Sequence, residues 1–278
     1  MSSRPYHLTL PARCTTGVVF ASPHSGRMYP ASFLRRSVLD ERAIRSSEDA
    51  FVDRLLEVVP DFGAPLLTAI APRAFVDLNR APDELDPAVI EGVTVGAHNP
   101  RINSGLGGVP RVVAGGKAIH RGKMARHEAE ARIDTWWHPY HAQLAELMAA
   151  ARREFSQAIL IDMHSMPHEA LDSIAAIGAR SGLRRPEVVV GDRYGTSASE
   201  ETVSGIQAAF EAVGLRVVRN TPFAGAYIVQ TYGLVYTTPG KNAFLTATYC
   251  VMVPFMAWWF RKKRPDRYNI SAAFICIA

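Results

Sequence analysis

Short apolar runs rich in β-branched residues recur along the first 233 residues and predict buried strands. The run at residues 17–21 is followed by Ser22-Pro23, and the run at 158–161 is equally apolar. Further strands are predicted at residues 75–78, at 188–190 and from residue 217. Continuous apolar runs of this kind are typical of strands inside a sheet that is covered on both faces.

Between these runs, apolar residues recur at intervals of three and four and predict amphipathic helices. One helix is predicted to begin with Ser47 as its N-cap and to continue to Val59. A second is predicted over residues 126–153, with a break or kink at Pro139, because proline has no backbone donor. A third follows a capping box at 197–200 and ends at Gly214.

The alternation of strands and helices predicts an α/β fold with a largely parallel, covered sheet. The segment 83–117 is rich in Gly, Pro and Asn and is too long for a plain connection. We interpret this segment as a lid or binding loop, since long irregular loops in compact domains usually serve function.

Composition and charge exclude several classes of protein. Of the 278 residues, 48% are hydrophobic and 21% charged, which excludes extensive disorder and leaves enough chain for a substantial core. The net charge is +5, but residues 234–278 hold six bases and one acid, so residues 1–233 carry 25 of each sign. A neutral body gives no reason to expect a nucleic-acid partner. Three scattered cysteines are too few for a disulfide scaffold and favour a reducing, cytoplasmic setting.

The last 45 residues differ in composition from the rest of the chain. Residues 243–260 carry no charge and are followed by four consecutive bases at 261–264, a pattern that leaves a membrane span open. Because Pro254 interrupts this short segment, we favour a buried core element over a span. The first eleven residues lack the charged-then-apolar pattern of a signal peptide.

Two histidines directly follow predicted strands, at the edge where open α/β sheets bind ligands. His24 comes after the strand at 17–21, and His164 comes after the strand at 158–161. Asp162, two residues before His164, has the spacing to hold that imidazole in one orientation. A serine follows each histidine, but no Gly-x-Ser-x-Gly motif is present, and we set serine hydrolase chemistry aside.

A carboxylate is expected as a third ligand, because imidazoles, one carboxylate and an open position form a common catalytic zinc site. Glu48 and Asp49 stand at the start of a predicted helix, where a ligand would be held rigidly. Acids in the first turn also serve simply to complement the helix dipole. The residues alone do not separate Glu48 from Asp49.

Several short motifs occur together in a characteristic order. They are Ser22-Pro23-His24-Ser25-Gly26-Arg27, Glu48-Asp49-Ala50-Phe51-Val52-Asp53, Val76-Asp77-Leu78-Asn79-Arg80, His138-Pro139-Tyr140-His141, Asp162-Met163-His164-Ser165-Met166-Pro167, Gly191-Asp192-Arg193 and Asn220-Thr221-Pro222-Phe223. Over about residues 15–233 this ordered set resembles the N-formylglutamate amidohydrolase family.

The resemblance implies a zinc-carboxypeptidase-like (phosphorylase/hydrolase-like) three-layer α/β fold with a mixed, largely parallel central sheet. It implies one metallohydrolase-like domain over residues 1–233, followed by an atypical apolar and basic segment at 234–278. The implied reaction is metal-dependent hydrolysis of N-formyl-L-glutamate, or a related N-acyl amino acid, to formate and glutamate, a step of histidine degradation.

The resemblance also implies the site residues. It places Zn²⁺, or another divalent metal, on His24, Asp49 and His164. It places the small acidic substrate near Asn79 and Arg80, and a guanidinium suits a carboxylate because it offers two parallel donors. For a second substrate carboxylate we consider Arg193, Arg101 and Arg111, and Arg193 is the choice that we adopt.

The sequence departs from the family pattern after Gly233. The family is expected to carry a general-base glutamate there, but residues 234–278 contain no glutamate. The abrupt change in composition suggests a frameshift or a replaced terminus, and it leaves the general base unassigned. The alternative function is therefore a catalytically impaired homologue that binds an acidic metabolite or is tethered by its C-terminal segment.

Overall fold

A computed structural model describes residues 4–94, 99–166, 186–193 and 195–219 of the chain. The chain divides into two compact units, residues 1–166 and 167–278, and each unit is described by itself. The predicted domain boundary after residue 233 and the apolar segment 243–260 both lie outside the described residues. Both therefore stay predictions.

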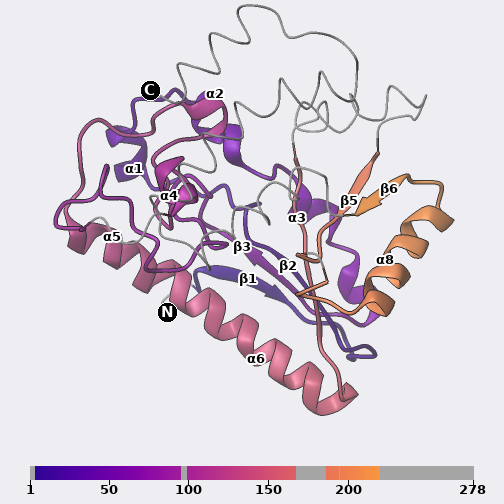
Figure 1. The fold of residues 1–278 in the computed structure, drawn as a ribbon. Coiled ribbons are helices and arrows are strands. Elements are labelled where there is room, and N and C mark those ends of the chain that lie inside the picture. Colours follow the sequence, from indigo (N-terminus) through magenta and orange to yellow (C-terminus); the bar gives the residue numbers. More distant parts are fainter. Residues whose placement is uncertain (1–3, 95–98, 167–185, 194, 220–278) are drawn as a thin grey trace, which may run out of the picture. The chain divides into compact units, whose positions relative to one another are not determined.

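The first unit is built on a four-stranded mixed sheet with the order β1-β3-β2-β4 (Figure 1). Strand β2 (Val18–Ser22) pairs in parallel with both β3 (Leu66–Ala69) and β4 (Ile159–Asp162). Strand β1 (Tyr6–Thr9) runs antiparallel to β3 and forms one edge. The predicted strands at 17–21 and 158–161 are confirmed, as is a mixed and mostly parallel sheet.

Helix α6 (His138–Phe155) runs along one face of this sheet (Figure 1). Its buried residues Tyr140 and Leu147 belong to the same core cluster as Val19 of β2 and Leu67 of β3. The remaining short helices of this unit lie in its connections. They are α1 (Ala31–Arg36), α2 (Glu41–Ile44), η1 (Arg45–Ser47), α3 (Val52–Leu55), η2 (Val59–Phe62), α4 (Pro100–Asn103) and η3 (Ala114–Gly116).

The predicted helix from Ser47 to Val59 is wrong in its extent. Glu48 adopts an extended conformation, and Phe51 has a left-handed backbone with φ of 65°, so regular helix is confined to the four residues of α3. The break has a tertiary cause, because the Asp49 N–H donates to the main-chain oxygen of His24. That bond directs the chain toward the end of β2 instead of into a helix.

The predicted strand at residues 75–78 is also wrong. Val76 and Leu78 are buried, as the apolar pattern indicated, but the segment forms turns in which Phe75 and Val76 donate to the Pro72 oxygen. The strand of this region is instead β3, whose four residues are all buried. Burial of an apolar run therefore does not by itself imply an extended backbone.

The helix predicted over residues 126–153 is present, and the structure shows how it accommodates Pro139. Helix α5 (Arg126–Arg132) leads through a π-helical turn (Ile133–Trp137) directly into α6. In that turn the His138 N–H donates to the Ile133 oxygen, one residue further back than in an α-helix. The wider turn accommodates Pro139, which has no N–H to donate, and α5 and α6 therefore follow one another without an intervening loop.

The segment 83–117, outside the undescribed residues 95–98, packs onto the unit instead of standing free. Val89, Ile90 and Val109 form a small core with Met124 and Ala129. The buried Asp86 carboxylate accepts from Arg111 Nε at 2.9 Å and from the Ala88 N–H at 2.8 Å. This packing is the observed structure of the segment that we predicted to be a lid or binding loop.

In the second unit, β5 (Val188–Val190) and β6 (Val217–Arg219) form a parallel pair connected through helix α8 (Glu200–Ala212). Both strands and the helix are confirmed. The N-cap is Ser199, whose hydroxyl accepts from the Thr202 N–H, and not Ser197 as the capping-box prediction had it. Ser197 instead donates its N–H to the Asp192 oxygen, which holds it in the preceding turn.

No helix within the described ranges is both long and apolar enough to cross a membrane. The segment 243–260, where the sequence left a span open, falls outside those ranges.

Candidate metal centre

Neighbouring parallel strands bring the two histidines together. Ala21 of β2 pairs with Asp162 of β4, and the ladder continues through a bond from the Met163 N–H to the Ala21 oxygen. His24 and His164 follow within three residues of that register, at the carboxyl ends of both strands. Their ring centroids lie 4.8 Å apart.

Asp49 reaches the same place on the connection that precedes α3. Besides its main-chain bond to His24, its loop is fixed by a bidentate pair between Arg27 and Asp53, with distances of 2.9 and 2.8 Å. Gly26 lets the His24 loop lie against the end of β3, since a Cβ atom there would come within 2.1 Å of the Ala71 oxygen.

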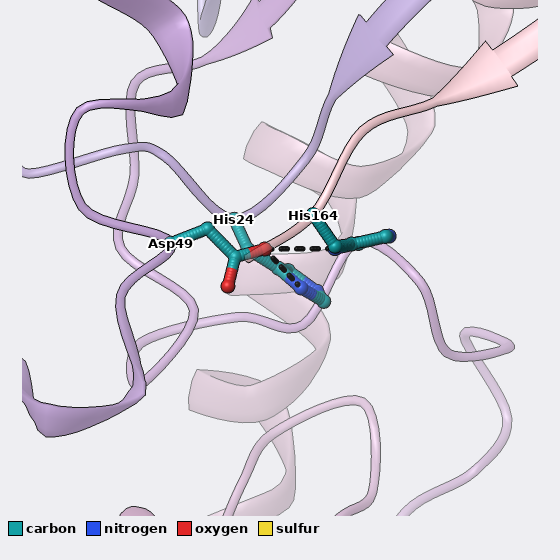
Figure 2. Close-up of side chains that lie close together, drawn as sticks. All are labelled: His24, Asp49 and His164. Atoms are coloured by element: carbon teal, nitrogen blue, oxygen red, sulfur yellow. Dashed lines mark hydrogen bonds and ion pairs between the residues drawn. The ribbon is translucent and has the colours of Figure 1, made fainter. Parts of the chain in front are cut away.

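The Asp49 carboxylate lies between the two imidazoles (Figure 2). Its Oδ2 atom is 2.8 Å from His164 Nδ1 and 3.6 Å from His24 Nδ1, while Oδ1 accepts from the Ser165 hydroxyl at 3.2 Å. One ligand atom from each of His24, Asp49 and His164 lies within 4.8 Å of the other two. The structure thus brings together all three residues predicted to bind metal.

Glu48, the other acid considered, points elsewhere. Its carboxylate accepts from the Tyr29 hydroxyl at 2.6 Å and pairs with Arg45. Glu48 has an extended backbone, and the two adjacent carboxylates point to different partners: Glu48 to Tyr29 and Arg45, and Asp49 to the histidines.

His24 is held by a buried carboxylate on its far side. Its Nε2 atom lies 2.8 Å from Asp77 Oδ1, and both side chains are buried. Its Nδ1 atom is buried and has no hydrogen-bond partner among the described residues. Buried polar atoms are normally paired, so an unpaired imidazole nitrogen facing Asp49 and His164 marks a position for a missing partner.

The environment of His164 includes the predicted residue Asp162. His164 Nε2 lies 3.0 Å from Asp162 Oδ2, and the Asn79 amide nitrogen lies 2.8 Å from each of these two atoms. Asp162 therefore stands where an orienting carboxylate is expected, and Asn79 stands beside the candidate metal centre.

Paired charges shift the pKa values of this group. Burial alone would lower the pKa of His164, but hydrogen bonds to Asp162 and Asp49 raise it to about 9. For Asp49, burial acts to raise the pKa, while the hydrogen bond with His164 and the nearby His24 imidazole outweigh it and hold the pKa well below its usual range. An ionised carboxylate beside two imidazoles creates an electrostatic environment suited to a cation.

Arg80 lies close to this group but does not touch its ligand atoms. Its buried Nε atom lies 3.9 Å from Asp77 Oδ2 and finds no hydrogen-bond partner in the described ranges. Arg111 is engaged by Asp86 and by the Asn103 oxygen. Arg193 belongs to the second unit and has an exposed side chain, so its predicted contact with substrate stays a prediction.

The sequence reasoning did not assign roles to Asp77 or Ser165. Asp77 lies in one of the motifs, within a run that we predicted to be a strand and that forms turns instead. The signal that could have found it is a single acid in an otherwise apolar run, since a buried carboxylate requires partners.

The donor set suits a divalent metal. Two imidazole nitrogens and one carboxylate oxygen are ligands that Zn²⁺ takes in catalytic sites, where a fourth position remains open. The unpaired Nδ1 of His24 and the orienting carboxylates behind both histidines fit the same use.

The fold and the site together define the class of protein. It is an α/β protein that carries two histidines and one carboxylate, a candidate metal centre, at the carboxyl ends of its central strands. A sequence profile of the family described as N-formylglutamate amidohydrolase matches residues 16–237. The chain belongs to this family, and the expected extent of the resemblance agrees closely with the match.

Curated relatives have the same family character. An N-formylglutamate deformylase of Pseudomonas aeruginosa is 28% identical over 224 residues, covering 78% of this chain and 74% of the relative. An N-formylglutamate deformylase of Pseudomonas putida is 26% identical over 225 residues, with the same coverage.

Solved structures agree. The crystal structure of N-formylglutamate amidohydrolase from Ralstonia eutropha superposes with a TM-score of 0.68 at 34% identity, covering 79% of this chain and 78% of the other. A gene product of Agrobacterium tumefaciens, at 17% identity and a TM-score of 0.51 over 79% of this chain and 74% of the other, shares the fold.

Proposed function

We propose that this protein is a metal-dependent amidohydrolase that cleaves N-formyl-L-glutamate, or a related N-acyl amino acid, to formate and the free amino acid. The observation that carries the proposal is the convergence of His24, Asp49 and His164 on one point. The names of the Pseudomonas and Ralstonia relatives support the N-formylglutamate substrate.

His24, Asp49 and His164 would hold Zn²⁺ or another divalent metal through Nδ1, a carboxylate oxygen and Nδ1. A metal bound there supplies Lewis acidity toward a carbonyl oxygen and lowers the pKa of water. Asp162 would orient the His164 imidazole from the side away from Asp49. Arg80 and Asn79 flank the centre, where a guanidinium and an amide can receive a substrate carboxylate.

Several finer features belong to the same proposal. We infer a zinc-carboxypeptidase-like three-layer arrangement, a role in histidine degradation and a cytoplasmic location. The family membership supports the first two, and the sparse, scattered cysteines support the third.

The proposal is tested on the purified full chain by metal analysis combined with a formate-release assay. Chelation should abolish hydrolysis of N-formyl-L-glutamate and Zn²⁺ should restore it. His24→Ala and Asp49→Asn should lose both metal and activity. His138→Ala is the matched control, because that side chain is half-exposed and its ring neighbours are Asp134 and Trp137, neither of which is a candidate metal ligand. Full activity without metal, or unchanged metal content in both site variants, would refute the proposal.

The substrate is resolved by comparing three compounds. N-acetyl-L-glutamate keeps both carboxylates and enlarges the acyl group, while N-formyl-L-leucine keeps the formyl group and removes the side-chain charge. A preference for N-formyl-L-glutamate over both compounds supports a site that recognises the small acyl group and the side-chain carboxylate together. Equal turnover of N-formyl-L-leucine would remove the acidic-substrate assignment.

One observation favours a second candidate function. Residues 234–278 contain no glutamate, although the family pattern leads us to expect a general base there. General acid–base help is worth about 10²–10⁴-fold in rate, so a chain without it would bind an acidic metabolite and turn it over slowly. Turnover by this chain should be compared with a variant whose terminus follows the family pattern; equal rates would exclude impairment by the terminus.

A further inference from the structure

We propose that Asp77 is a positioning residue of the metal centre, which fixes His24 in the tautomer that presents Nδ1 to the metal. The inference rests on the proposed function, because it concerns the same centre. Asp77 was not among the site residues predicted from the sequence.

The geometry of His24 leaves its two ring nitrogens in different surroundings. Nε2 is 2.8 Å from Asp77 Oδ1, whereas Nδ1 is 3.6 Å from the nearest Asp49 oxygen and forms no hydrogen bond within the part of the chain that the structure describes. An ionised carboxylate can only accept, so the proton of a neutral imidazole resides on Nε2. The lone pair then lies on Nδ1, which faces Asp49 and His164 and is the form that a metal requires.

Asp77 is itself held on both oxygens. Oδ1 also accepts from the Asn79 N–H at 2.9 Å, and Oδ2 accepts from Arg73 Nε at 3.0 Å. The side chain is fully buried, so water does not compete for these bonds. These bonds hold the carboxylate in one orientation. Through its bond to Nε2, the carboxylate in turn holds the His24 ring in place relative to the turns at 72–80.

The same carboxylate lies 3.9 Å from the buried Nε atom of Arg80. Asp77 thus lies between the candidate metal ligand His24 and the candidate substrate residue Arg80. Loss of its charge should disturb both, but the metal site first, because His24 makes a direct hydrogen bond with Asp77 whereas Arg80 Nε stays 3.9 Å away.

The chain contains a closely matched control. Asp86 is also buried, accepts from the N–H two residues ahead at 2.8 Å and from an arginine Nε at 2.9 Å. It differs from Asp77 in that, among the described residues, none of its hydrogen bonds reaches a candidate ligand. Asp77→Asn and Asp86→Asn therefore impose the same loss of charge and the same unfavourable amide beside an arginine.

The test measures Zn²⁺ affinity of the full chain by competition with a chromophoric chelator, together with the Co²⁺ absorption spectrum. Loss of an orienting carboxylate typically costs about 10–100-fold in metal affinity. We expect Asp77→Asn to weaken Zn²⁺ binding by that factor and to alter the Co²⁺ spectrum, while Asp86→Asn changes neither. Equal effects of the two variants, or none from Asp77→Asn, would overturn the inference.

A second measurement needs no variant and remains available if Asp77→Asn does not fold. The ¹⁵N shifts of His24 in the metal-free chain report which ring nitrogen carries the proton. We expect Nε2–H, and an Nδ1–H tautomer would overturn the inference. Failure of the unaltered chain to bind Zn²⁺ would instead count against the proposed function, so the two failures are distinguishable.

Discussion

The pKa of His164 determines how metal binding to this protein depends on pH. Burial alone would lower that pKa, but Asp162 at 3.0 Å and Asp49 at 2.8 Å raise it to about 9. In the metal-free protein His164 is therefore protonated at neutral pH. A metal must displace this proton in order to bind, because only the neutral imidazole is a ligand.

The size of the effect on metal affinity follows from the difference between pH 7 and the pKa of His164. Each pH unit below the pKa weakens the apparent affinity about tenfold, so Zn²⁺ should bind about 100-fold more weakly at pH 7 than above pH 9. Asp162→Asn removes the carboxylate that contributes most to the upward shift. In that variant the pKa should fall, and the pH dependence should level off at a lower pH.

The assay is chelator competition between pH 6 and 9, corrected for the protonation of the chelator, beside an NMR titration of His164 in the metal-free chain. The raised pKa also has a consequence for folding. It stabilises the metal-free protein fully below about pH 6.5, the pKa of an unfolded histidine, and the contribution is lost as pH rises through about 9. Titration of His164 near 6.5, or a Zn²⁺ affinity that does not change between pH 7 and 9, would refute this reasoning.

Two further predictions test the substrate side and the local packing. Arg80→Lys keeps the charge but loses the planar fork, so KM for N-formyl-L-glutamate should rise about tenfold or more with metal content unchanged; an unaltered KM would remove Arg80 from the substrate site. Gly26→Ala should destabilise the fold by about 1–3 kcal/mol in urea unfolding, since its Cβ would meet the Ala71 oxygen. Gly205→Ala, in helix α8 with open space around it, should instead stabilise by about 0.5–1 kcal/mol, and equal effects of the two would contradict the packing argument.

The strand-end histidines could be predicted because their signals are local. An apolar run followed by Pro23-His24 or by Asp162-Met163-His164 is visible in the sequence, and both strands form as expected. The periodicity of α8 and of the long α5–α6 rod is local too, and these helices are present.

The failures concern segments whose conformation is set by distant partners. The helix predicted from Ser47 stops because the Asp49 N–H bonds to His24, 25 positions earlier. The mostly apolar run at 75–78 is buried, yet its backbone forms turns. The N–H groups of Phe75 and Val76 donate to the Pro72 oxygen, and the Asp77 N–H donates to the Gly108 oxygen. Hydrophobic periodicity reports burial, and it cannot report the hydrogen bonds that a buried backbone finds elsewhere.

By itself, the sequence determined the class of fold, the family and the two candidate histidine ligands, because each depends on residue types in a fixed order. Only the tertiary structure decided between Glu48 and Asp49, and only it placed Asp77 behind His24. Those choices depend on which way a side chain points once β2, β3 and β4 are paired. The direction of a side chain depends on the folded backbone that carries it, and the spacing of residues along the sequence does not specify that direction.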